Sequence, residues 1–394
     1  MISSLGQGLS ALQSALSDNT CGIRMNKLKV PAPGEDSVDA LCALVDDIDL
    51  SGITSDKISL RHIDRNTQLA LAATDEAIAQ ARLDPEALKS CCTVLGTSSG
   101  STQSIEDNYH RLFAQGRTAL SPTTVPRSMS TAALSALSLA YGIQGICFVV
   151  ASACASGAHA IGEGFQMIRS GRTDIALVGG TEAAVTFGIW KAWDALNAMS
   201  SDGCRPFCAT RNGLALGEGA AMFILESEQS VQRRGAKVLG ELVGYGYSSD
   251  AYHITQPSQD GVEIAIRGAF KDAGVDPREG ALISTHGTGT KLNDATESKA
   301  LNAIMGSGLD ASDVIATKSV HGHLLGAGGA LELAIGIDAL NRKTAPPIHG
   351  FREPDEDIQL PLVVGQAKPI DSRYLLSNSF AFGGLNVSLL VQSV

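Results

Sequence analysis

One cysteine stands at a place in the sequence where a thiol can act as a nucleophile. Cys154 follows an apolar run (146–150) and precedes the small residues 155–157, so it is expected at the turn from a strand into a helix. The N-terminus of a helix favours negative charge, and a cysteine there is more readily a thiolate nucleophile. A buried structural cysteine is the alternative, and the local pattern does not separate the two.

Two histidines lie on turns that can hold an imidazole toward open space. His286 opens the segment His-Gly-Thr-Gly-Thr (286–290), directly after a strand-like run, and His323 ends Lys-Ser-Val-His-Gly-His (318–323). A single histidine of this kind is more often structural. Two of them on equivalent turns, together with Cys154 at a strand–helix junction, favour an active site.

The elements that position these residues occur in two similar series. Val-Leu-Gly-Thr-Ser-Ser-Gly (94–100) resembles Ile-Ser-Thr-His-Gly-Thr-Gly (283–289), and each is a strand that runs into a Gly/Thr turn. The cysteine segment 152–157 corresponds in order to the segment 319–326. These correspondences predict that the chain is a duplicated α/β unit.

The wider pattern agrees with α/β structure, because short apolar runs alternate with amphipathic stretches. Helical spacing of apolar residues predicts helices over 69–81 and 261–273. We expect residues 1–236 to form a half that carries the nucleophile, and residues 237–394 a half that carries the two histidines. Strands are predicted over 92–95, 147–150, 175–178, 221–225, 282–284 and 387–391.

Composition and charge exclude several classes of protein. The chain has 41 acidic and 30 basic residues and a formal charge of −11, whereas a sequence-independent nucleic-acid binder needs a basic surface. Residues 128–162 lack charges, but polar residues such as Gln144 interrupt them, so a buried segment is favoured over a membrane span. The start has no secretion signal, and we expect a cytoplasmic protein. Cys204 and Cys208 have loosely metal-like spacing without a second ligand pair, so no metal site is expected.

Four ordered motifs resemble the signatures of the β-ketoacyl-ACP synthases of the KAS I/II type. The resemblance runs over nearly the whole chain and implies a thiolase-like fold, with two duplicated α/β halves in αβαβα layers. The motifs are Ser-Ala-Cys-Ala-Ser-Gly-Ala-His (152–159), His-Gly-Thr-Gly-Thr (286–290) with Asn293, Asp294 and Glu297 following, Thr-Lys-Ser-x-x-Gly-His-x-x-Gly-Ala (317–327) and Asn-Ser-Phe-Ala-Phe-Gly-Gly-Leu-Asn (378–386).

The resemblance implies a reaction and a set of substrates. Cys154 would take an acyl group from phosphopantetheine on acyl carrier protein (ACP), and the enolate of a malonyl unit would attack it after decarboxylation. His286 and His323 would stabilise that enolate as CO2 leaves. ACP would deliver both substrates, no cofactor of the enzyme's own is implied, and the assembly would be a homodimer or a heterodimer with a related subunit.

The resemblance also assigns supporting residues around the nucleophile. Lys318 would set the electrostatics of the pocket and pair with Glu297. The backbone N–H of Phe382, together with that of the nucleophile, would form an oxyanion hole, and the loop around it would act as a gate. Thr288 and Thr290 match positions that hydrogen-bond the pantetheine arm, although hydroxyls that stabilise the turn are the alternative.

Less specific positions concern the acyl chain and the carrier. Ser99 matches a position that limits the depth of the acyl pocket, and Trp193 is expected along the same pocket. Because the protein is acidic, an acidic carrier must find a local basic patch, for which Arg61, Arg65 and Arg117 are candidates; ordinary solvated surface is the alternative.

Departures and rival readings qualify the resemblance. Ala381 replaces a customary glycine, Leu385 a threonine and His321 a threonine, and these changes bear on gating and substrate choice.

A non-catalytic chain-length partner is the main rival function, but such a partner has lost the cysteine. A thiolase needs a second catalytic cysteine late in the chain, and the last cysteine is Cys208. The chain starts about one strand short of the usual family start, so we expect a mis-assigned or trimmed N-terminus.

Overall fold

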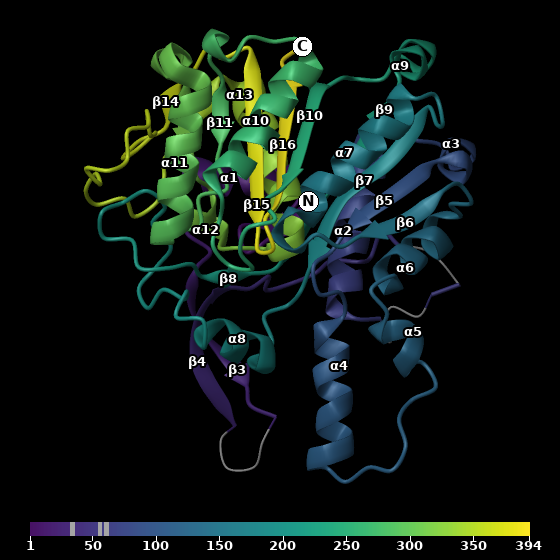
Figure 1. Ribbon diagram of the computed structural model, residues 1–394. Coiled ribbons are helices and arrows are strands. Elements are labelled where there is room, and N and C mark those ends of the chain that lie inside the picture. Colours follow the sequence, from purple (N-terminus) through teal and green to yellow (C-terminus); the bar gives the residue numbers. More distant parts are fainter. Residues whose placement is uncertain (32–35, 54–56, 59–62) are drawn as a thin grey trace.

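Two mixed β-sheets form the framework of the computed structural model, which describes residues 1–31, 36–53, 57–58 and 63–394 (Figure 1). The first sheet has the strand order β2-β1-β9-β7-β5-β6 and the second β10-β16-β15-β11-β12. Their strands are β1 (Ile2–Ser3), β2 (Gly6–Gln7), β5 (Cys92–Gly96), β6 (Cys147–Val150), β7 (Ile175–Glu182), β9 (Gly219–Glu226), β10 (Glu241–Ser249), β11 (Leu282–Ser284), β12 (Asp313–Ile315), β15 (Tyr374–Ala381) and β16 (Leu385–Gln392).

Two small sheets and the helices complete the chain. The small sheets are β3-β4-β8, from β3 (Arg24–Lys29), β4 (Ser37–Ala43) and β8 (Leu216–Gly217), and β13-β14, from β13 (Thr344–Ala345) and β14 (Lys368–Pro369). The α-helices are α1 (Leu9–Ser17), α2 (Arg65–Ala81), α3 (Pro85–Ser90), α4 (Thr102–Tyr109), α5 (Thr124–Ser128), α6 (Ala132–Tyr141), α7 (Ser156–Arg169), α8 (Phe187–Asp194), α9 (Glu228–Arg234), α10 (Gln259–Ala273), α11 (Lys291–Met305), α12 (Lys318–His321) and α13 (Gly328–Arg342).

The two large sheets repeat one pattern of pairing. In the first, β5 lies between the parallel strands β6 and β7, and β7 pairs antiparallel with β9. In the second, β11 lies between the parallel strands β12 and β15, and β15 pairs antiparallel with β16. The predicted duplication of an α/β unit is confirmed. The division between residues 236 and 237, in the link from α9 to β10, stays a proposal.

The sheets and helices stack in five layers. Helices α7 and α13 contact both sheets and lie between them, α2 and α6 cover the outer face of the first sheet, and α10 and α11 cover that of the second (Figure 1). Buried apolar residues fill the central layer and each outer layer. Because α7 and α13 begin at the carboxyl ends of β6 and β12, the layering brings their first turns together in the middle of the molecule.

The predicted elements agree with the observed ones apart from their ends. Helix α2 begins at Arg65, four residues before the first apolar residue of its pattern, Leu69. The Asp64 carboxylate accepts from the Asn66 N–H and so caps a polar first turn that apolar spacing does not reveal. Among the described residues, no helix is long and apolar enough to span a bilayer.

Candidate active site

The turn that carries Cys154 is short and strained. Cys154 lies in a 3-10 segment (Ala153–Ala155) between β6 and α7. Ala153 has a φ of 48°, a left-handed conformation that alanine seldom adopts. The Ser156 hydroxyl accepts from the Ser152 N–H at 2.9 Å and donates to the Ala153 carbonyl at 2.6 Å. The thiol therefore projects from the start of α7, as the sequence predicts.

Glycines allow this turn to meet the turn that carries His323. A Cβ on Gly157 would lie 2.8 Å from the carbonyl oxygen of Gly326, and a Cβ on Gly96 would lie 2.4 Å from the Ser156 backbone. A side chain at Gly157 would push the two turns apart, and one at Gly96 would push β5 away from the start of α7. The small residues around the nucleophile thus permit backbone-to-backbone contact between the two halves.

His323 faces the thiol through one nitrogen. Its Nε2 lies 3.1 Å from the Cys154 sulfur, and its Nδ1 accepts from the Leu325 N–H at 3.3 Å. Because Nδ1 accepts, the ring proton of the neutral imidazole resides on Nε2. The His323 backbone is fixed by bonds to the Ala215 carbonyl and the Gly217 N–H. His323 therefore presents a hydrogen-bond donor to the sulfur.

His286 is oriented in the same way by a different partner. Its Nδ1 lies 3.4 Å from the Lys318 ammonium, and its ring centroid is 5.4 Å from that of His323. An ammonium can only donate, so the proton of the neutral His286 ring also resides on Nε2. Both histidines thus carry an Nε2–H with which to stabilise negative charge on a substrate oxygen.

Lys318 pairs with Glu332, and the prediction that it pairs with Glu297 is wrong. Lys318 and Glu332 are each 1% exposed, and the ammonium donates to the Glu332 carboxylate. Glu297 instead accepts from the backbone N–H groups of His286 and Gly287 at 2.8 and 2.9 Å. It positions the His286 turn, whereas Glu332 balances the buried charge of the lysine.

The charge states of the site follow from its burial. Burial and the Lys318 charge lower the pKa of His286 and of His323 well below the usual range, so both rings are neutral at physiological pH. Burial raises the pKa of Cys154 to about 12, although Lys318 opposes the shift. Burial therefore outweighs the expected effect of the helix terminus, which favours a thiolate. The resting thiol keeps its proton.

Phe382 and Trp193 close the site on one side. Phe382 lies in the turn between β15 and β16, is 38% exposed, and stacks on Trp193 with centroids 5.4 Å apart. The rings of Trp193 and His323 also meet edge to face, with their centroids 6.4 Å apart. The backbone N–H groups of Phe382 and Cys154 favour the charged form of the sulfur and so oppose the rise in its pKa. The arrangement provides a neutral thiol, two N–H-bearing imidazoles and two backbone donors.

Comparison with known families gives this arrangement its context. The model described as "Beta-ketoacyl synthase, N-terminal domain" matches residues 1–230, and "Beta-ketoacyl synthase, C-terminal domain" matches residues 239–352. The chain belongs to the β-ketoacyl synthase family. It is accordingly a condensing acyltransferase, and the thiolase-like fold predicted from the sequence is confirmed.

Individual relatives cover most of the synthase. Nodulation protein E of Rhizobium sp. (strain N33) is 38% identical over 341 residues, covering 86% of this chain and 85% of the relative. The 3-oxoacyl-[acyl-carrier-protein] synthase 2 of Staphylococcus aureus (strain COL) is 36% identical over 345 residues, covering 85% and 83%. The solved ishigamide ketosynthase/chain length factor superposes with a TM-score of 0.91 at 33% identity, over 100% of this chain and 97% of the other.

Two buried carboxylates of the synthase were missed by sequence reasoning. Glu332 is the only acidic or basic residue other than histidine between Lys318 and Asp338, and a single acid in so apolar a stretch signals a buried partner for the lysine. Glu182 ends the fully buried strand β7 and accepts from the backbone N–H groups of Ser98 and Gly326 at 2.6 and 3.1 Å. It ties the Ser98 turn to the His323 turn.

The predicted substrate-binding residues lie at different depths. Thr288 is buried, and its hydroxyl oxygen lies 2.9 Å from that of the half-buried Thr290. Ser99 is exposed, and its N–H donates to Glu182 at 3.2 Å. Both placements are compatible with contact to substrate, and the assignments stay proposals.

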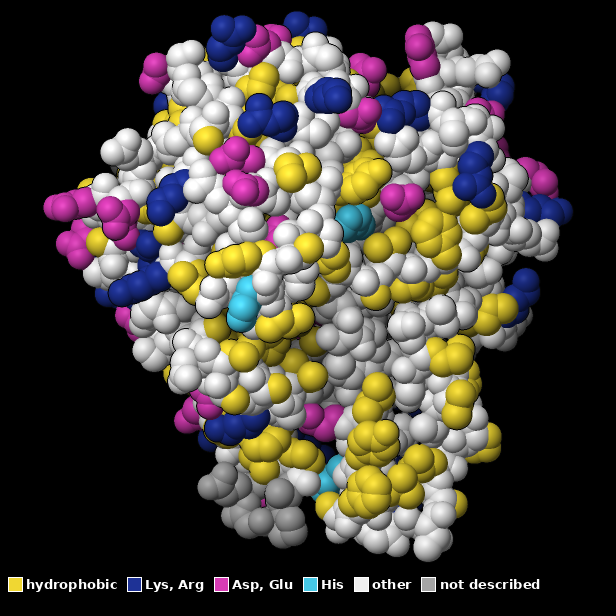
Figure 2. Space-filling view, viewed as in Figure 1, with side chains coloured by type: hydrophobic (Ala, Val, Ile, Leu, Met, Phe, Trp, Pro, Cys, Tyr) yellow, Lys and Arg dark blue, Asp and Glu magenta, His cyan; other side chains and the backbone are white. Residues whose placement is uncertain are grey.

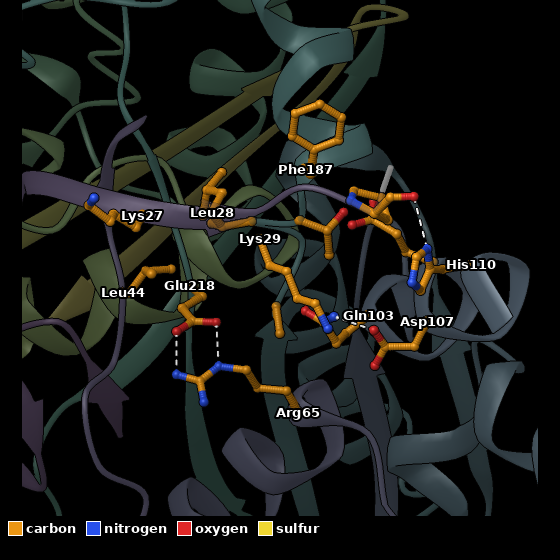
Figure 3. A pocket seen from close by; sticks show the side chains of 15 residues that line it. Lys27, Leu28, Lys29, Leu44, Arg65, Gln103, Asp107, His110, Phe187 and Glu218 are labelled. Atoms are coloured by element: carbon orange, nitrogen blue, oxygen red, sulfur yellow. Dashed lines mark hydrogen bonds and ion pairs between the residues drawn. The ribbon is translucent and has the colours of Figure 1, made fainter. Parts of the chain in front are cut away.

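Arg65 is engaged within the synthase and does not offer a free docking charge. Its Nε and Nη2 bond the two carboxylate oxygens of Glu218 at 2.8 and 2.6 Å, at the edge of a cavity of about 210 Å³ (Figure 3). Glu218 is buried, so this two-point pair is well placed to hold the carboxylate. This pairing makes Arg65 a weaker docking candidate, and its docking role stays a proposal. Arg61 lies outside the described residues, and Arg117 is exposed after α4.

Proposed function

We propose that this synthase catalyses the decarboxylative Claisen condensation of malonyl-ACP with an acyl group carried on Cys154. The product is a β-ketoacyl-ACP, in chain elongation of the fatty-acid or polyketide/polyene type. The main support is a pair of contacts where the two halves meet. The Cys154 sulfur contacts His323 Nε2, and the Lys318 ammonium orients His286. ACP is the proposed donor of both substrates, with phosphopantetheine arriving as part of it.

The first step transfers the acyl group. The Cys154 sulfur attacks the acyl thioester carbonyl of acyl-ACP, the C–S bond to pantetheine breaks, and the thiol proton passes to the departing pantetheine sulfur. The sulfur must lose its proton in a site that disfavours the thiolate, and the His323 Nε2–H and the N–H of Phe382 stabilise the charge as it develops. The backbone N–H groups also stabilise the oxyanion formed on the thioester carbonyl.

The second step forms the carbon–carbon bond. The malonyl C–CO2 bond breaks, CO2 leaves, and the electron pair becomes an enolate whose oxygen accepts from the Nε2–H groups of His286 and His323. The enolate carbon then attacks the acyl carbonyl on Cys154, and the sulfur departs as a thiolate that takes up a proton from solvent. Neutral imidazoles suit this task, because they donate without first being charged.

The rival function of a non-catalytic chain-length partner is not favoured. Such a partner needs neither a nucleophile nor a decarboxylation site, yet Cys154, His286 and His323 are all present and in contact. The family relatives named as synthases point the same way. An assembly of this synthase with a related subunit is a separate question from its own activity.

The proposed function predicts a covalent acyl-enzyme. After incubation with acyl-ACPs that differ in length and unsaturation, mass spectrometry of proteolytic peptides should find the acyl mass on Cys154, and added malonyl-ACP should convert it to β-ketoacyl-ACP. The other seven cysteines serve as internal controls. An enzyme that condenses acyl groups without any adduct on Cys154, or that loads none of the panel, would contradict the assignment.

Partner binding is proposed from two surface features. Arg117 lies exposed beside the tip of α4, and we retain it as a docking residue for an acidic carrier. The edge strand β6 is half-buried, and exposed apolar side chains gather on that side, over α4 to α6 (Figure 2). Among the described residues β6 has an unpaired edge, preceded by the exposed Ile146, and Phe113 and Met129 are exposed on the chain between α4 and α6. These features are suited to a second synthase-like chain, in a homodimer or a heterodimer. A cytoplasmic location remains part of the proposal.

The acyl chain has a proposed path along α8. Trp193 and Ile189 pack in the apolar cluster around Cys154, and Ile189 also lines a largely apolar cavity of about 480 Å³ beside Tyr109 and Phe113. This path supports tolerance of medium to long or conjugated acyl groups, because aromatic faces stack well on a flat chain.

A substitution at Ser99 can test what limits the length of acyl chain that this path accepts. We expect Ser99→Ile to reduce loading of long acyl-ACPs relative to short ones by about tenfold, since a bulky side chain must rotate aside before a long chain enters. Ratios of loading rates for matched long and short acyl-ACPs provide the measurement. Ser98→Ala, next to it in the same turn, is the matched control and should leave the ratio unchanged. An unchanged ratio in Ser99→Ile would show that Ser99 only completes the turn.

A further inference from the structure

His159 closes the motif Ser-Ala-Cys-Ala-Ser-Gly-Ala-His, yet no step of the proposed reaction uses it. It lies on α7, and its Nδ1 is 2.8 Å from the hydroxyl oxygen of Ser152. The ring is half-buried and meets the ring of Tyr245 edge-on, with centroids 6.4 Å apart. Burial lowers the pKa of His159 to about 4, so the ring is neutral in the physiological range.

Ser152 is held by all of its polar groups. Its N–H donates to the Ser156 hydroxyl at 2.9 Å, its carbonyl accepts from the Ala155 N–H at 3.1 Å, and its hydroxyl bonds His159. The next residue is Ala153, with its φ of 48°. A strained conformation of this kind persists only where the surroundings over-determine it. The bonds of Ser152 provide that constraint on the N-terminal side of Ala153.

The position of the Cys154 sulfur depends on the backbone conformation of this strained residue. The Cys154 sulfur is 3.1 Å from His323 Nε2, and the backbone N–H of Phe382 favours its charged form. If Ala153 relaxed to an ordinary φ, the peptide before Cys154 would rotate and the sulfur would leave these donors. The equivalent turn of the second half has the same feature at Leu325, with a φ of 45°, where Glu182 holds the following N–H of Gly326.

We propose that His159 is a positioning residue for the nucleophile. Through the Ser152 hydroxyl it holds the turn at Ala153, so that the Cys154 sulfur faces His323. The consequence for acyl transfer rests on the proposed function, whereas the consequence for the thiol itself does not. His159 touches no reacting atom and acts through Ser152.

The test separates acyl transfer from decarboxylation. For His159→Ala we expect acylation of Cys154 by acyl-ACP to slow about five- to tenfold, the effect of losing one hydrogen bond that orients a reacting group. Decarboxylation of malonyl-ACP should stay within twofold, because His286 and His323 are untouched. Alkylation of Cys154 by iodoacetamide, followed by peptide mass spectrometry, should slow in parallel with acylation. This readout needs no acyl substrate and therefore does not depend on the proposed function.

Three further single variants and one double variant make the outcome decisive. His159→Asn, whose amide can replace Nδ1, should restore most of the acylation rate, and Tyr245→Phe, which keeps the ring contact, should change it little. Ser152→Ala should mimic His159→Ala, and the double variant should be no slower than either single one. Additive losses, equal losses of acylation and decarboxylation, or no loss in His159→Ala would each overturn the proposal.

Discussion

Cys154→Ala should abolish formation of β-ketoacyl-ACP, by about a thousandfold or more, while decarboxylation of malonyl-ACP remains measurable. The reason is the division of labour in the site. In the proposed mechanism the sulfur alone carries the acyl group, whereas the enolate is stabilised by the Nε2–H groups of His286 and His323, which other bonds hold in place. Product formation and CO2 release, followed on the same samples, measure the two activities.

The matched control for this variant is another buried thiol. Cys91 is 1% exposed, and burial raises its pKa to about 12, as for Cys154, but it lies between α3 and β5, at the opposite end of β5 from the Gly96 turn. Cys91→Ala should therefore retain condensation. If Cys154→Ala still condenses at the parent rate, the assignment of the nucleophile is wrong.

His286→Ala and His323→Ala should each slow decarboxylation of malonyl-ACP by about 10²–10³-fold, the usual cost of removing one preorganised donor from a developing oxyanion. Acylation of Cys154 should persist in both. The structure adds a distinction, because only His323 lies 3.1 Å from the sulfur. Acylation should therefore be slower in His323→Ala than in His286→Ala. Rates of CO2 release and of acyl loading provide the comparison.

Asparagine variants and pH distinguish a donor from a base. His286→Asn supplies a neutral N–H and should recover about tenfold over alanine, whereas a catalytic base could not be replaced in this way. The pKa of each histidine is lowered, so the neutral, active form is present throughout the range above it and is lost only as the pH falls through that low value. Decarboxylation should be flat between pH 6 and 8. His349→Ala, at a half-buried histidine outside the site, is the control.

The sequence by itself identified the candidate residues for the chemistry and showed where the main strands run. Cys154 and His286 were identifiable because each follows a strand at a turn of small residues, and His323 because it lies on the corresponding glycine-containing turn of the second half. Such turns are encoded by a few consecutive positions. The alternation of apolar runs likewise predicted strands such as β5 and β11 and the duplicated order of elements. Local patterns carry this information, and it does not depend on which segments later pack together.

Tertiary structure decided how these residues are paired and charged. Glu332 rather than Glu297 balances Lys318, and Glu218 engages Arg65 across 153 positions of chain. Tertiary structure also decided the protonation state of Cys154, because desolvation outweighs the effect of the helix terminus and raises the pKa of the thiol to about 12. Burial and long-range pairing are properties of how the two halves pack against each other, and the free energy of a charge depends on that packing rather than on its sequence neighbours.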